Sequence, residues 1–446
     1  MKFGGTSVQD TPSMLNVAEI VKEHLHLNPF VVISAIAQGT NMLTTIGKEA
    51  ESGNKILYQK NIETFIGRHH EIVENGVQVN ETKERLFERI SKVEKELLRL
   101  SEGIYLLKEC SPRSLDALCV NGEYLSSLCI SEIFREQGID NVWIDARAFI
   151  VTDSNFTAAS PQMKKVKERF SSILNEKKYE GKVFITQGFI GATENGVPTT
   201  MGRESSDFSA AVIGEAINAS EIQIWTDVDG IFTADPRVIS QAKHIAELTF
   251  EEALELADKG AKVLHPKTML PAMERNIPIR IRNSKNKKSS GSLITSEIKQ
   301  QNGAVSIAQK KDVILIRFSP FDKKNYPLLS EHISGLHAKY CISPLSQISD
   351  ERGITFLFQH IPSVDFFIRE ISEIGQTEIQ TNLSLISLVG RNIFRDEKVM
   401  SIFANAAYRN NIKFLFNGAS QKSIGVVIDE YIATEFLKEL HQSLFV

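Results

Sequence analysis

A lysine and a pair of glycines stand near the start of the chain, in the run Lys2-Phe3-Gly4-Gly5-Thr6-Ser7-Val8. Glycine lets the backbone approach a ligand closely, and successive N–H groups in a tight turn can donate to phosphate oxygens. A nearby lysine supplies the positive charge that such a group needs. The run predicts an anion site, with phosphate as the first hypothesis, although Gly-Gly alone is also typical of a strand-to-helix turn without a ligand.

Other polar stretches of the same character follow further along the chain. They are Ser34–Leu43, Asn121–Leu125, Gln187–Ser209, Trp225–Arg237 and Gly260–Pro266. Each lies next to an expected strand end or begins an expected helix. In open α/β sheets ligands collect outside the carboxyl ends of the strands, so we expect these stretches to share one cleft.

The helices and strands that position these residues are predicted to form an α/β domain with a mostly parallel sheet. Continuous apolar runs predict buried strands at Phe30–Ile33, Val142–Ile144, Val183–Ile185 and Ile222–Trp225, with helical patterns between them. The segment Glu81 to Leu100 carries apolar residues at spacings of four and three, which favours a helix with one face in the core or at a subunit contact.

Composition limits the class of protein. The chain has 446 residues, of which 42% are hydrophobic and 24% charged, as in ordinary globular proteins. A net charge of −4 gives no basic field for nucleic acid, and no apolar run is long enough to cross a bilayer. The four cysteines form no Cys-x-x-Cys pair and the ten histidines no ligand-spaced set with them, which disfavours zinc and disulfides.

The last third of the chain differs from the first two. After a polar, basic loop at Asn283 to Ser292, the pattern of strand, helix and strand appears twice, in Val313–Phe358 and again in Leu383–Ile428, before a final helix at Thr434–Leu444. We therefore expect a large domain over residues 1–298 and two small α+β modules over 304–378 and 379–446. Such paired modules suggest regulation, or a dimerisation platform without a ligand.

Three motifs together give the chain a specific resemblance. In order and spacing, they resemble the signatures of aspartate kinases in the amino-acid kinase superfamily. The motifs are the glycine run, Ile224-Trp225-Thr226-Asp227 with Asp235-Pro236-Arg237, and Gly260-Ala261-Lys262-Val263-Leu264-His265-Pro266. The resemblance covers the first 300 residues, and the tail resembles the paired ferredoxin-like ACT modules of that family. It implies the three-layer amino-acid-kinase fold of the carbamate-kinase-like type.

The resemblance also implies a reaction, the ATP- and Mg²⁺-dependent phosphorylation of the β-carboxylate of L-aspartate to 4-phospho-L-aspartate. This is the first step from aspartate to lysine, threonine and methionine. A carboxylate with a pKa of about 4 is already ionised at neutral pH, so it needs no general base. Catalysis must then come from positioning and charge neutralisation.

Residue roles follow from the same resemblance. The catalytic set is Lys2, Lys262 and Asp207, and the phosphate-binding set is Gly4, Gly5, Thr6 and Ser7. The expected aspartate-binding residues are Ser34, Thr40, Glu123, Arg203 and Ser206, with Arg203 for the α-carboxylate and Glu123 for the α-ammonium. ATP is expected at Thr226, Asp227, Phe232, Arg237 and Lys262. No residue is expected to bind metal directly, because Mg²⁺ is carried by ATP, and Asp229 is left out of the site because turn aspartates commonly bond their own backbone.

Two stretches depart from the family pattern. Arg203-Glu204-Ser205-Ser206-Asp207 has a carboxylate at Glu204 where the family usually has glycine or asparagine, which could weaken aspartate binding. In the first module, Pro320 to Asn325 and Ile342 to Gln347 match the lysine-binding pattern of the family poorly, so the effector is lysine, threonine or none. The second module keeps the family pattern at Asn417-Gly418-Ala419-Ser420.

Alternative functions stay open at this point. The chain could phosphorylate another small acid such as glutamate, or it could be a catalytically silent amino-acid sensor that keeps the kinase fold as a scaffold. Because Met1 leads straight into the glycine run, we expect a cytoplasmic protein, with a missed upstream start codon as a further reading. The resemblance implies the monofunctional type and a homodimer formed through the ACT modules.

Overall fold

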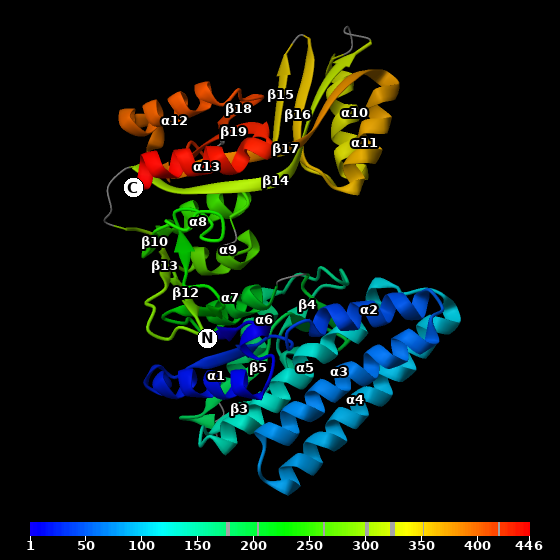
Figure 1. Ribbon diagram of the computed structural model, residues 1–446. Coiled ribbons are helices and arrows are strands. Elements are labelled where there is room, and N and C mark those ends of the chain that lie inside the picture. The colour runs from blue at the N-terminus through cyan, green and yellow to red at the C-terminus, as the bar shows by residue number, and fades with distance from the viewer. Residues whose placement is uncertain are drawn as a thin grey trace. The chain divides into compact units, whose positions relative to one another are not determined.

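The computed structural model describes residues 1–174, 179–202, 205–261, 264–298, 303–321, 326–350, 352–417 and 420–446. The chain forms two compact units. The first unit comprises Met1–Ile231, Ala246–Phe250 and Leu264–Ile298, and the second comprises Phe232–Ile245, Glu251–Val263 and Lys299–Val446 (Figure 1). No helix among the described residues has both the length and the apolar character that a membrane span requires.

A mostly parallel sheet forms the centre of the first unit. Within the described residues it has eight strands in the order β11-β13-β12-β8-β1-β2-β5-β3, and only the neighbours β12 and β13 run antiparallel. The strands are β1 (Lys2–Phe3), β2 (Phe30–Ile33), β3 (Asn141–Trp143), β5 (Val183–Gln187), β8 (Ile222–Thr226), β11 (Glu247–Thr249), β12 (Ile279–Asn283) and β13 (Ser292–Thr295). This confirms the predicted α/β class and the buried strands β2, β5 and β8. The segment Val142–Ile144, also predicted to be a buried strand, is only half-buried, because β3 lies at the edge of the sheet.

Helices cover this sheet in the three-layer arrangement. They are α1 (Thr11–Glu23), α2 (Gly39–Glu51), α3 (Lys55–Gly76), α4 (Asn80–Leu107), α5 (Pro112–Glu136), α6 (Met163–Leu174), α7 (Ser205–Ala216) and α9 (Pro266–Glu274). Helix α5 packs on β2, β3 and β5, whereas α7 packs on β1, β2 and β8. Ser111 begins α5 by accepting a hydrogen bond from the Ser114 N–H, and Pro112 follows at the first helical position.

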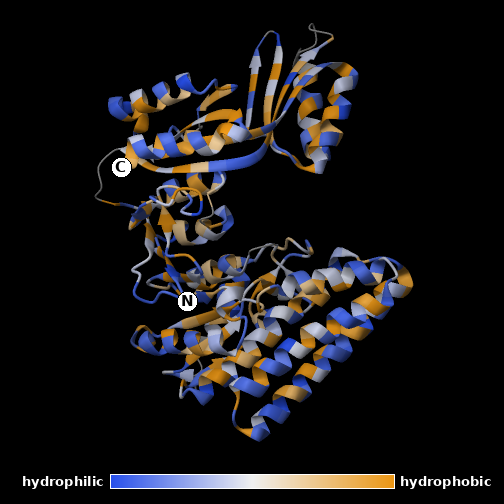
Figure 2. Cartoon of the chain, viewed as in Figure 1, coloured by the Kyte–Doolittle hydropathy of each residue, from blue (hydrophilic) through white to orange (hydrophobic). Residues whose placement is uncertain are grey.

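The long helices α2 to α5 pack side by side at the edge of the first unit (Figure 1). Leu86, Ile90, Val93 and Leu97 of α4 are buried, so the predicted stripe faces the core. Figure 2 shows the same alternation as orange and blue bands along these helices. Beside the main sheet lies a small one, formed by β4 (Val151–Thr152), β6 (Ile190–Thr193) and β7 (Pro198–Thr200).

The second unit contains an antiparallel sheet with the order β15-β16-β14-β17-β19-β18 among its described residues. Its strands are β14 (Gly303–Pro320), β15 (Ser346–Asp350), β16 (Gly353–Gln359), β17 (Gly375–Arg391), β18 (Phe414–Asn417) and β19 (Ser423–Asp429). Its helices are α8 (Phe250–Asp258), α10 (Tyr326–Lys339), α11 (Pro362–Ile374), α12 (Glu397–Arg409) and α13 (Glu430–Phe445). A short ribbon of β9 (Ile231–Phe232) and β10 (His244–Ile245) precedes α8.

The described residues form three hydrophobic clusters on this sheet, of which one is made by the strands alone and the other two include helices. One gathers residues of α10, α11 and β16 around Phe356 and Phe367, and the other gathers α12 and α13 around Phe403 and Phe436. Ile307, at the start of β14, packs in the cluster around Phe403 and Phe436 although it lies within the predicted first module, residues 304–378. The sequence pattern overlooked helix α11, and the predicted boundaries at 298, 304, 378 and 379 stay a prediction.

Candidate active site

Three neighbouring parallel strands end at the same edge of the large sheet. Lys2 pairs with Val32 of β2 and with Ile224 of β8, which sets the registers of β1 between them. The Gly4 N–H donates to the Trp225 carbonyl at 3.1 Å, and the Ser34 N–H donates to the Phe3 carbonyl at 3.2 Å. The segments that follow β1, β2 and β8 therefore leave the sheet together, as expected for a ligand site of an open α/β sheet.

The glycine turn after β1 is fixed by close backbone packing. A Cβ atom on Gly5 would lie 2.8 Å from the Ala35 carbonyl oxygen, closer than real Cβ contacts allow, so only glycine fits there. The Ser7 N–H donates to the Gly4 carbonyl at 2.9 Å, and residues Gly5–Ser7 form one turn of 3₁₀ helix. This compact turn follows the strand that carries Lys2.

Lys2 and Asp207 form an ion pair at this turn. Lys2 Nζ lies 2.6 Å from Asp207 Oδ1, and the two side chains are 10% and 21% exposed. Asp207 sits in the first turn of α7, beside Ser206. A Cβ atom on Gly188 would lie 2.7 Å from Ser206 Cβ, so glycine there lets the start of α7 approach the end of β5. The predicted residues Lys2, Gly4 and Asp207 thus lie close together.

Glu123 lies in the middle of α5 and is buried, with 2% of its surface exposed. Burial raises its pKa to about 8, although the Ala35 N–H and the charge of Lys2 both act in the opposite direction. Its Oε2 atom has no hydrogen-bond partner among the described residues. A buried carboxyl oxygen of this kind can accept a donor from a ligand, and an ammonium would also favour its charged form.

The other predicted polar residues of this edge have different environments. Ser34 is buried, and its carbonyl accepts the Ser126 hydroxyl at 2.6 Å. Thr40 is half-buried in the first turn of α2, and Thr6 is exposed. Ser7 is buried, and its hydroxyl shares a hydrogen bond of 2.8 Å with Ser284. That bond ties the glycine turn to the residue that follows β12.

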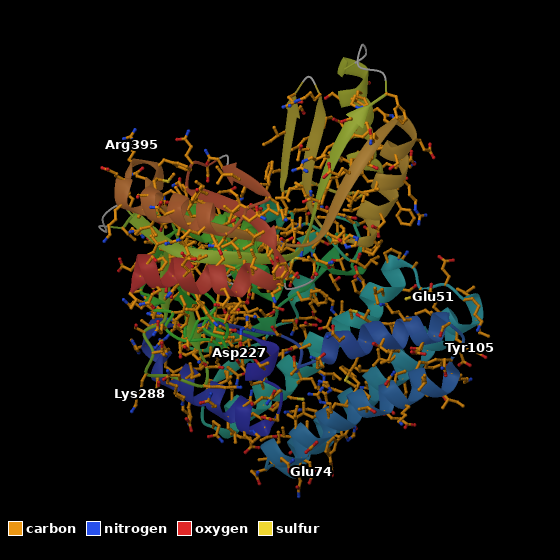
Figure 3. All side chains as sticks on the ribbon, turned by 45° about the horizontal axis from the view of Figure 1, so that its top comes forward. Glu51, Glu74, Tyr105, Asp227, Lys288 and Arg395 are labelled. Carbon is orange, nitrogen blue, oxygen red and sulfur yellow. The ribbon has the colours of Figure 1, made fainter. Side chains whose placement is uncertain are left out.

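The predicted nucleotide residues are divided between the two compact units. Thr226 and Asp227 belong to the first, and Asp227 is exposed on the turn after β8 (Figure 3). Phe232 and Arg237 belong to the second, where the Phe232 ring stands edge-on to His244 at 5.6 Å and Arg237 pairs with Asp235 at 2.6 Å.

Several residues of the sequence analysis lie outside the described residues. They are Arg203, Glu204, Lys262, Val263, Gly418, Ala419 and the segment 322–325. Conversely, Asp229, which sequence reasoning left out of the site, accepts hydrogen bonds at 3.0 Å from Asn283 and from Asn286, so it braces the loop after β12 instead of its own backbone.

Sequence reasoning also missed a backbone partner of Glu123 and a second buried acid on the same helix. The backbone N–H of Ala35 bonds Glu123, and the buried carboxylate of Asp116, two helical turns before Glu123 on α5, accepts three hydrogen bonds. Backbone donors leave no side-chain signal in a sequence. Asp116 does leave one, because its spacing of seven from Glu123 places both acids on one face of a helix.

Comparison with known proteins agrees with this geometry. The sequence model of the Amino acid kinase family matches residues 1–283. Lysine-sensitive aspartokinase 3 of Escherichia coli (strain K12) is 32% identical over 463 aligned residues, covering 100% of this chain and 98% of the relative. A bifunctional aspartokinase/homoserine dehydrogenase 2 of Arabidopsis thaliana is 28% identical over 472 residues, and this chain spans 50% of its length.

Solved structures give the same result over the full chain. E. coli aspartokinase III in complex with aspartate and ADP matches with a TM-score of 0.85 at 30% identity, covering 100% of this chain and 99% of that one. The same enzyme in complex with lysine and aspartate matches with a TM-score of 0.84 at 30% identity, with the same coverage. On its motifs, its fold and these matches, the chain belongs to the aspartokinases of the amino acid kinase family.

Proposed function

We propose that this protein transfers the γ-phosphoryl group of ATP to the β-carboxylate of L-aspartate, giving 4-phospho-L-aspartate and ADP. The observation that carries the proposal is the Lys2–Asp207 ion pair, mostly shielded from water, beside the Gly4-Gly5 turn, in a chain that matches an aspartokinase solved with aspartate and ADP. This reaction begins the biosynthesis of amino acids derived from aspartate.

The chemistry needs little from the protein except position and charge. A β-carboxylate oxygen forms a bond to the γ-phosphorus, and the bond from that phosphorus to the bridging oxygen of ADP breaks. The nucleophile is ionised at neutral pH, so no proton is removed from it. Both reactants are anions, and the ammonium of Lys2 would offset their repulsion. The turn after Gly4 would bring backbone N–H groups near the phosphates, whereas the Gly4 N–H itself donates to the Trp225 carbonyl.

Asp207 keeps Lys2 in place for this role. A lysine side chain has four rotatable bonds, and a carboxylate 2.6 Å from its Nζ selects one arrangement of them. Lys262 matches the second family lysine of the reaction and would add positive charge from the other side of the transferring group.

Aspartate would be recognised by two opposite charges. Glu123 is suited to the α-ammonium, because an unpartnered buried carboxyl oxygen gains both a hydrogen bond and a counter-charge when an ammonium arrives. Arg203 would bind the α-carboxylate with its guanidinium fork. Ser34, Thr40 and Ser206 are the proposed contacts to the rest of the substrate.

ATP would occupy Thr226, Asp227, Phe232, Arg237 and Lys262, with its phosphates at Gly4, Gly5, Thr6 and Ser7. Mg²⁺ would be carried on the ATP phosphates, where it neutralises charge as the phosphoryl group moves. The described residues contain no group of three or more His, Cys, Asp or Glu that could hold a metal. Asp207, with a carboxylate oxygen buried beside Lys2, is the acid that would lie nearest to such a magnesium ion.

The two modules of the second unit would carry regulation and pairing of subunits. We place an amino-acid effector there, and lysine is the first candidate because the E. coli relative is named lysine-sensitive. A homodimer through these modules is the expected assembly. Titration of the activity with lysine and with threonine, together with light scattering, tests both points.

The function itself is tested by trapping the acyl phosphate with hydroxylamine. ATP, Mg²⁺ and L-aspartate should give aspartyl hydroxamate, and L-glutamate in place of aspartate should give much less. A preference for glutamate would make glutamate the substrate instead of aspartate. If folded protein forms no hydroxamate with either acid, the kinase function is wrong and the catalytically silent sensor is favoured.

A further inference from the structure

A second buried acid on α5 has no part in the proposed chemistry. Asp116 is completely buried, and no ion pair involves it among the described residues. Its carboxylate accepts three hydrogen bonds, from the Thr157 N–H at 2.9 Å, the Thr200 N–H at 3.0 Å and the Thr200 hydroxyl at 2.6 Å. Burial raises the pKa of Asp116, and these donors act against the rise. Burying a carboxylate is costly, so its presence calls for a reason.

The three bonds fasten two segments to one helix. Thr200 is the last residue of β7, and Thr157 lies in the loop after β4. The two segments also bond each other, because the Ala159 N–H donates to the Thr200 carbonyl at 2.9 Å. Asp116 therefore holds a joint between α5, this loop and the end of β7.

The backbone at this joint is in an unusual conformation. Thr157 has φ +67°, a left-handed value that β-branched residues rarely adopt, and its N–H is one of those bound by Asp116. Gly202, two residues after Thr200, has φ +97°, a backbone conformation that favours glycine. A Cβ atom on Gly202 would lie 3.7 Å from the Thr157 carbonyl oxygen. Strained residues persist where the surroundings hold them, and they are concentrated at functional sites.

The position of this joint in the chain relates it to substrate binding. Arg203, the proposed reader of the α-carboxylate, follows Gly202 directly. Glu123, which is proposed to bind the α-ammonium, lies seven residues after Asp116 on the same face of α5. One helix face thus carries one substrate-binding acid and the anchor of the segment that leads to the substrate-binding arginine.

We propose that Asp116 is a positioning residue for aspartate, which fixes the end of β7 relative to Glu123 and so sets the affinity for the α-amino acid group. The inference rests on the proposed function. Asp116 contacts neither substrate nor nucleotide, and its effect passes through Thr200 and Thr157. Loosening the joint should weaken aspartate binding more than ATP binding or the chemical step.

The test is steady-state kinetics of Asp116→Asn, Thr200→Val and Thr200→Ser, with the melting temperature of each. Asparagine keeps the size of Asp116 but turns one acceptor into a donor, and valine keeps the shape of Thr200 without its hydroxyl. We expect the KM for aspartate to rise roughly tenfold in Asp116→Asn and less in Thr200→Val, with kcat and the KM for ATP within about twofold of wild type. Thr200→Ser should restore the wild-type KM.

A matched control lies on the same helix. Ser131 of α5 is buried and donates to Asn141 Oδ1 at 2.8 Å, so Ser131→Ala also removes a buried hydrogen bond of α5. It should lower the melting temperature without changing the KM for aspartate. If Asp116→Asn changes all kinetic parameters together, or leaves the KM for aspartate unchanged as the control does, the positioning role is wrong.

The outcomes separate this inference from the proposed function. An active wild type with an unchanged KM in the variants overturns only the inference, whereas an inactive, folded wild type overturns the function on which it rests. If Asp116→Asn does not fold, the comparison of Thr200→Val with Thr200→Ser decides, because these changes remove and restore a single hydroxyl.

Discussion

The ammonium of Lys2 lies 2.6 Å from Oδ1 of Asp207, so the first strand of the sheet and the first turn of α7 meet through one ion pair. The contact is mostly shielded from water, with exposed fractions of 10% and 21% for the two side chains. Charge interactions are stronger in such surroundings than on an open surface. Asp207 therefore holds the ammonium of Lys2 in a fixed position next to the Gly4-Gly5 turn.

Substituting either residue of this ion pair should lower kcat strongly and lower the stability of the fold less. Lys2→Met should lower kcat by roughly a hundredfold or more, because it removes a positioned charge that stabilises the transferring phosphoryl group. Asp207→Asn should lower kcat less, since Lys2 keeps its charge but loses its fixed direction. Hydroxamate formation at saturating aspartate and ATP measures both.

Lys165→Met is the matched control for this experiment. Lys165 pairs with Glu194 at 2.7 Å, but the two side chains are 39% and 63% exposed and lie on α6 and the turn after β6. This change should leave kcat as in wild type. An equal loss in Lys2→Met and Lys165→Met would contradict a catalytic role for Lys2.

Glu123 predicts a pH dependence of aspartate binding. Its pKa of about 8 in the folded protein lies above the ordinary value of 4.5, so without substrate the carboxyl is mostly protonated at pH 7. An ammonium prefers the ionised form, so binding must release a proton, and the affinity for aspartate should rise from pH 6 to pH 8 and then level off. Calorimetry in two buffers of different ionisation enthalpy would detect the released proton.

The same group affects stability in a defined direction. Because its folded pKa is raised, Glu123 contributes stability fully below pH 4.5, and this contribution is lost as the pH rises through 8. Glu123→Gln should bind aspartate more weakly, with no proton release, and should melt higher than wild type at pH 9 but not at pH 5. Identical proton release in the variant would show that another group titrates.

We expect a glycine-to-alanine substitution at Gly5 to cause a steric clash, and the same substitution at a second glycine serves as a control. Gly5→Ala would place a methyl group 2.8 Å from the Ala35 carbonyl oxygen, and overpacking of this kind costs about 1–3 kcal/mol. The glycine turn would have to move, so we expect a lower melting temperature and a higher KM for ATP.

Gly103→Ala is the control for that substitution. Gly103 lies inside α4, and a Cβ atom there would meet no atom within 4 Å. Alanine should stabilise this helix by up to about 1 kcal/mol and leave the KM for ATP unchanged. A Gly5→Ala variant with wild-type KM for ATP would remove the glycine turn from the phosphate site.

His69 predicts acid sensitivity of the first unit. It is fully buried on α3, its ring packs on Phe65 at 4.6 Å, and burial lowers its pKa to about 4. Between pH 6.5 and pH 4 the imidazole of His69 is protonated in the unfolded chain but neutral in the folded chain. The free energy of unfolding therefore falls as the pH falls, by up to about 1.4 kcal/mol per pH unit.

The measurement is the melting temperature of wild type and His69→Gln between pH 7.5 and pH 4.5. The wild type should lose more stability on acidification than the variant, which has no imidazole to protonate. Parallel curves for the two proteins would show that other groups govern the acid response.

Part of this architecture could be predicted from the sequence. Continuous apolar runs at Phe30–Ile33 and Ile222–Trp225 predicted buried strands, and these became the neighbours of β1. Because the polar residues after such strands meet at one edge, Gly4, Ser34 and Asp227 could be assigned to one region from the sequence alone. The apolar stripe that begins at Leu86 predicted α4, because residues spaced by three and four positions fall on one face only in a helix.

The rest depended on contacts that a linear pattern does not encode. Ala35 bonds Glu123 through its backbone, and Thr157 adopts a left-handed conformation that its residue type disfavours. Helix α11 did leave a signal, because its buried residues Val364, Phe367 and Ile371 are spaced by three and four, and the sequence analysis overlooked it. Ile307 packs with α12 and α13 because β14 is long enough to serve both cores, and strand length beyond the apolar run at Val313–Phe318 was not visible.

Phosphoryl transfer to the β-carboxylate of aspartate can be observed directly at the reacting carbon. L-Aspartate labelled with ¹³C at its β-carboxyl carbon is incubated with the protein, ATP and Mg²⁺ in an NMR tube. The labelled carbon should shift and acquire a coupling to phosphorus as ATP is converted to ADP. An unchanged carbon signal from folded protein, or a coupling that appears only when the α-carboxyl carbon carries the label, would contradict transfer to the β-carboxylate.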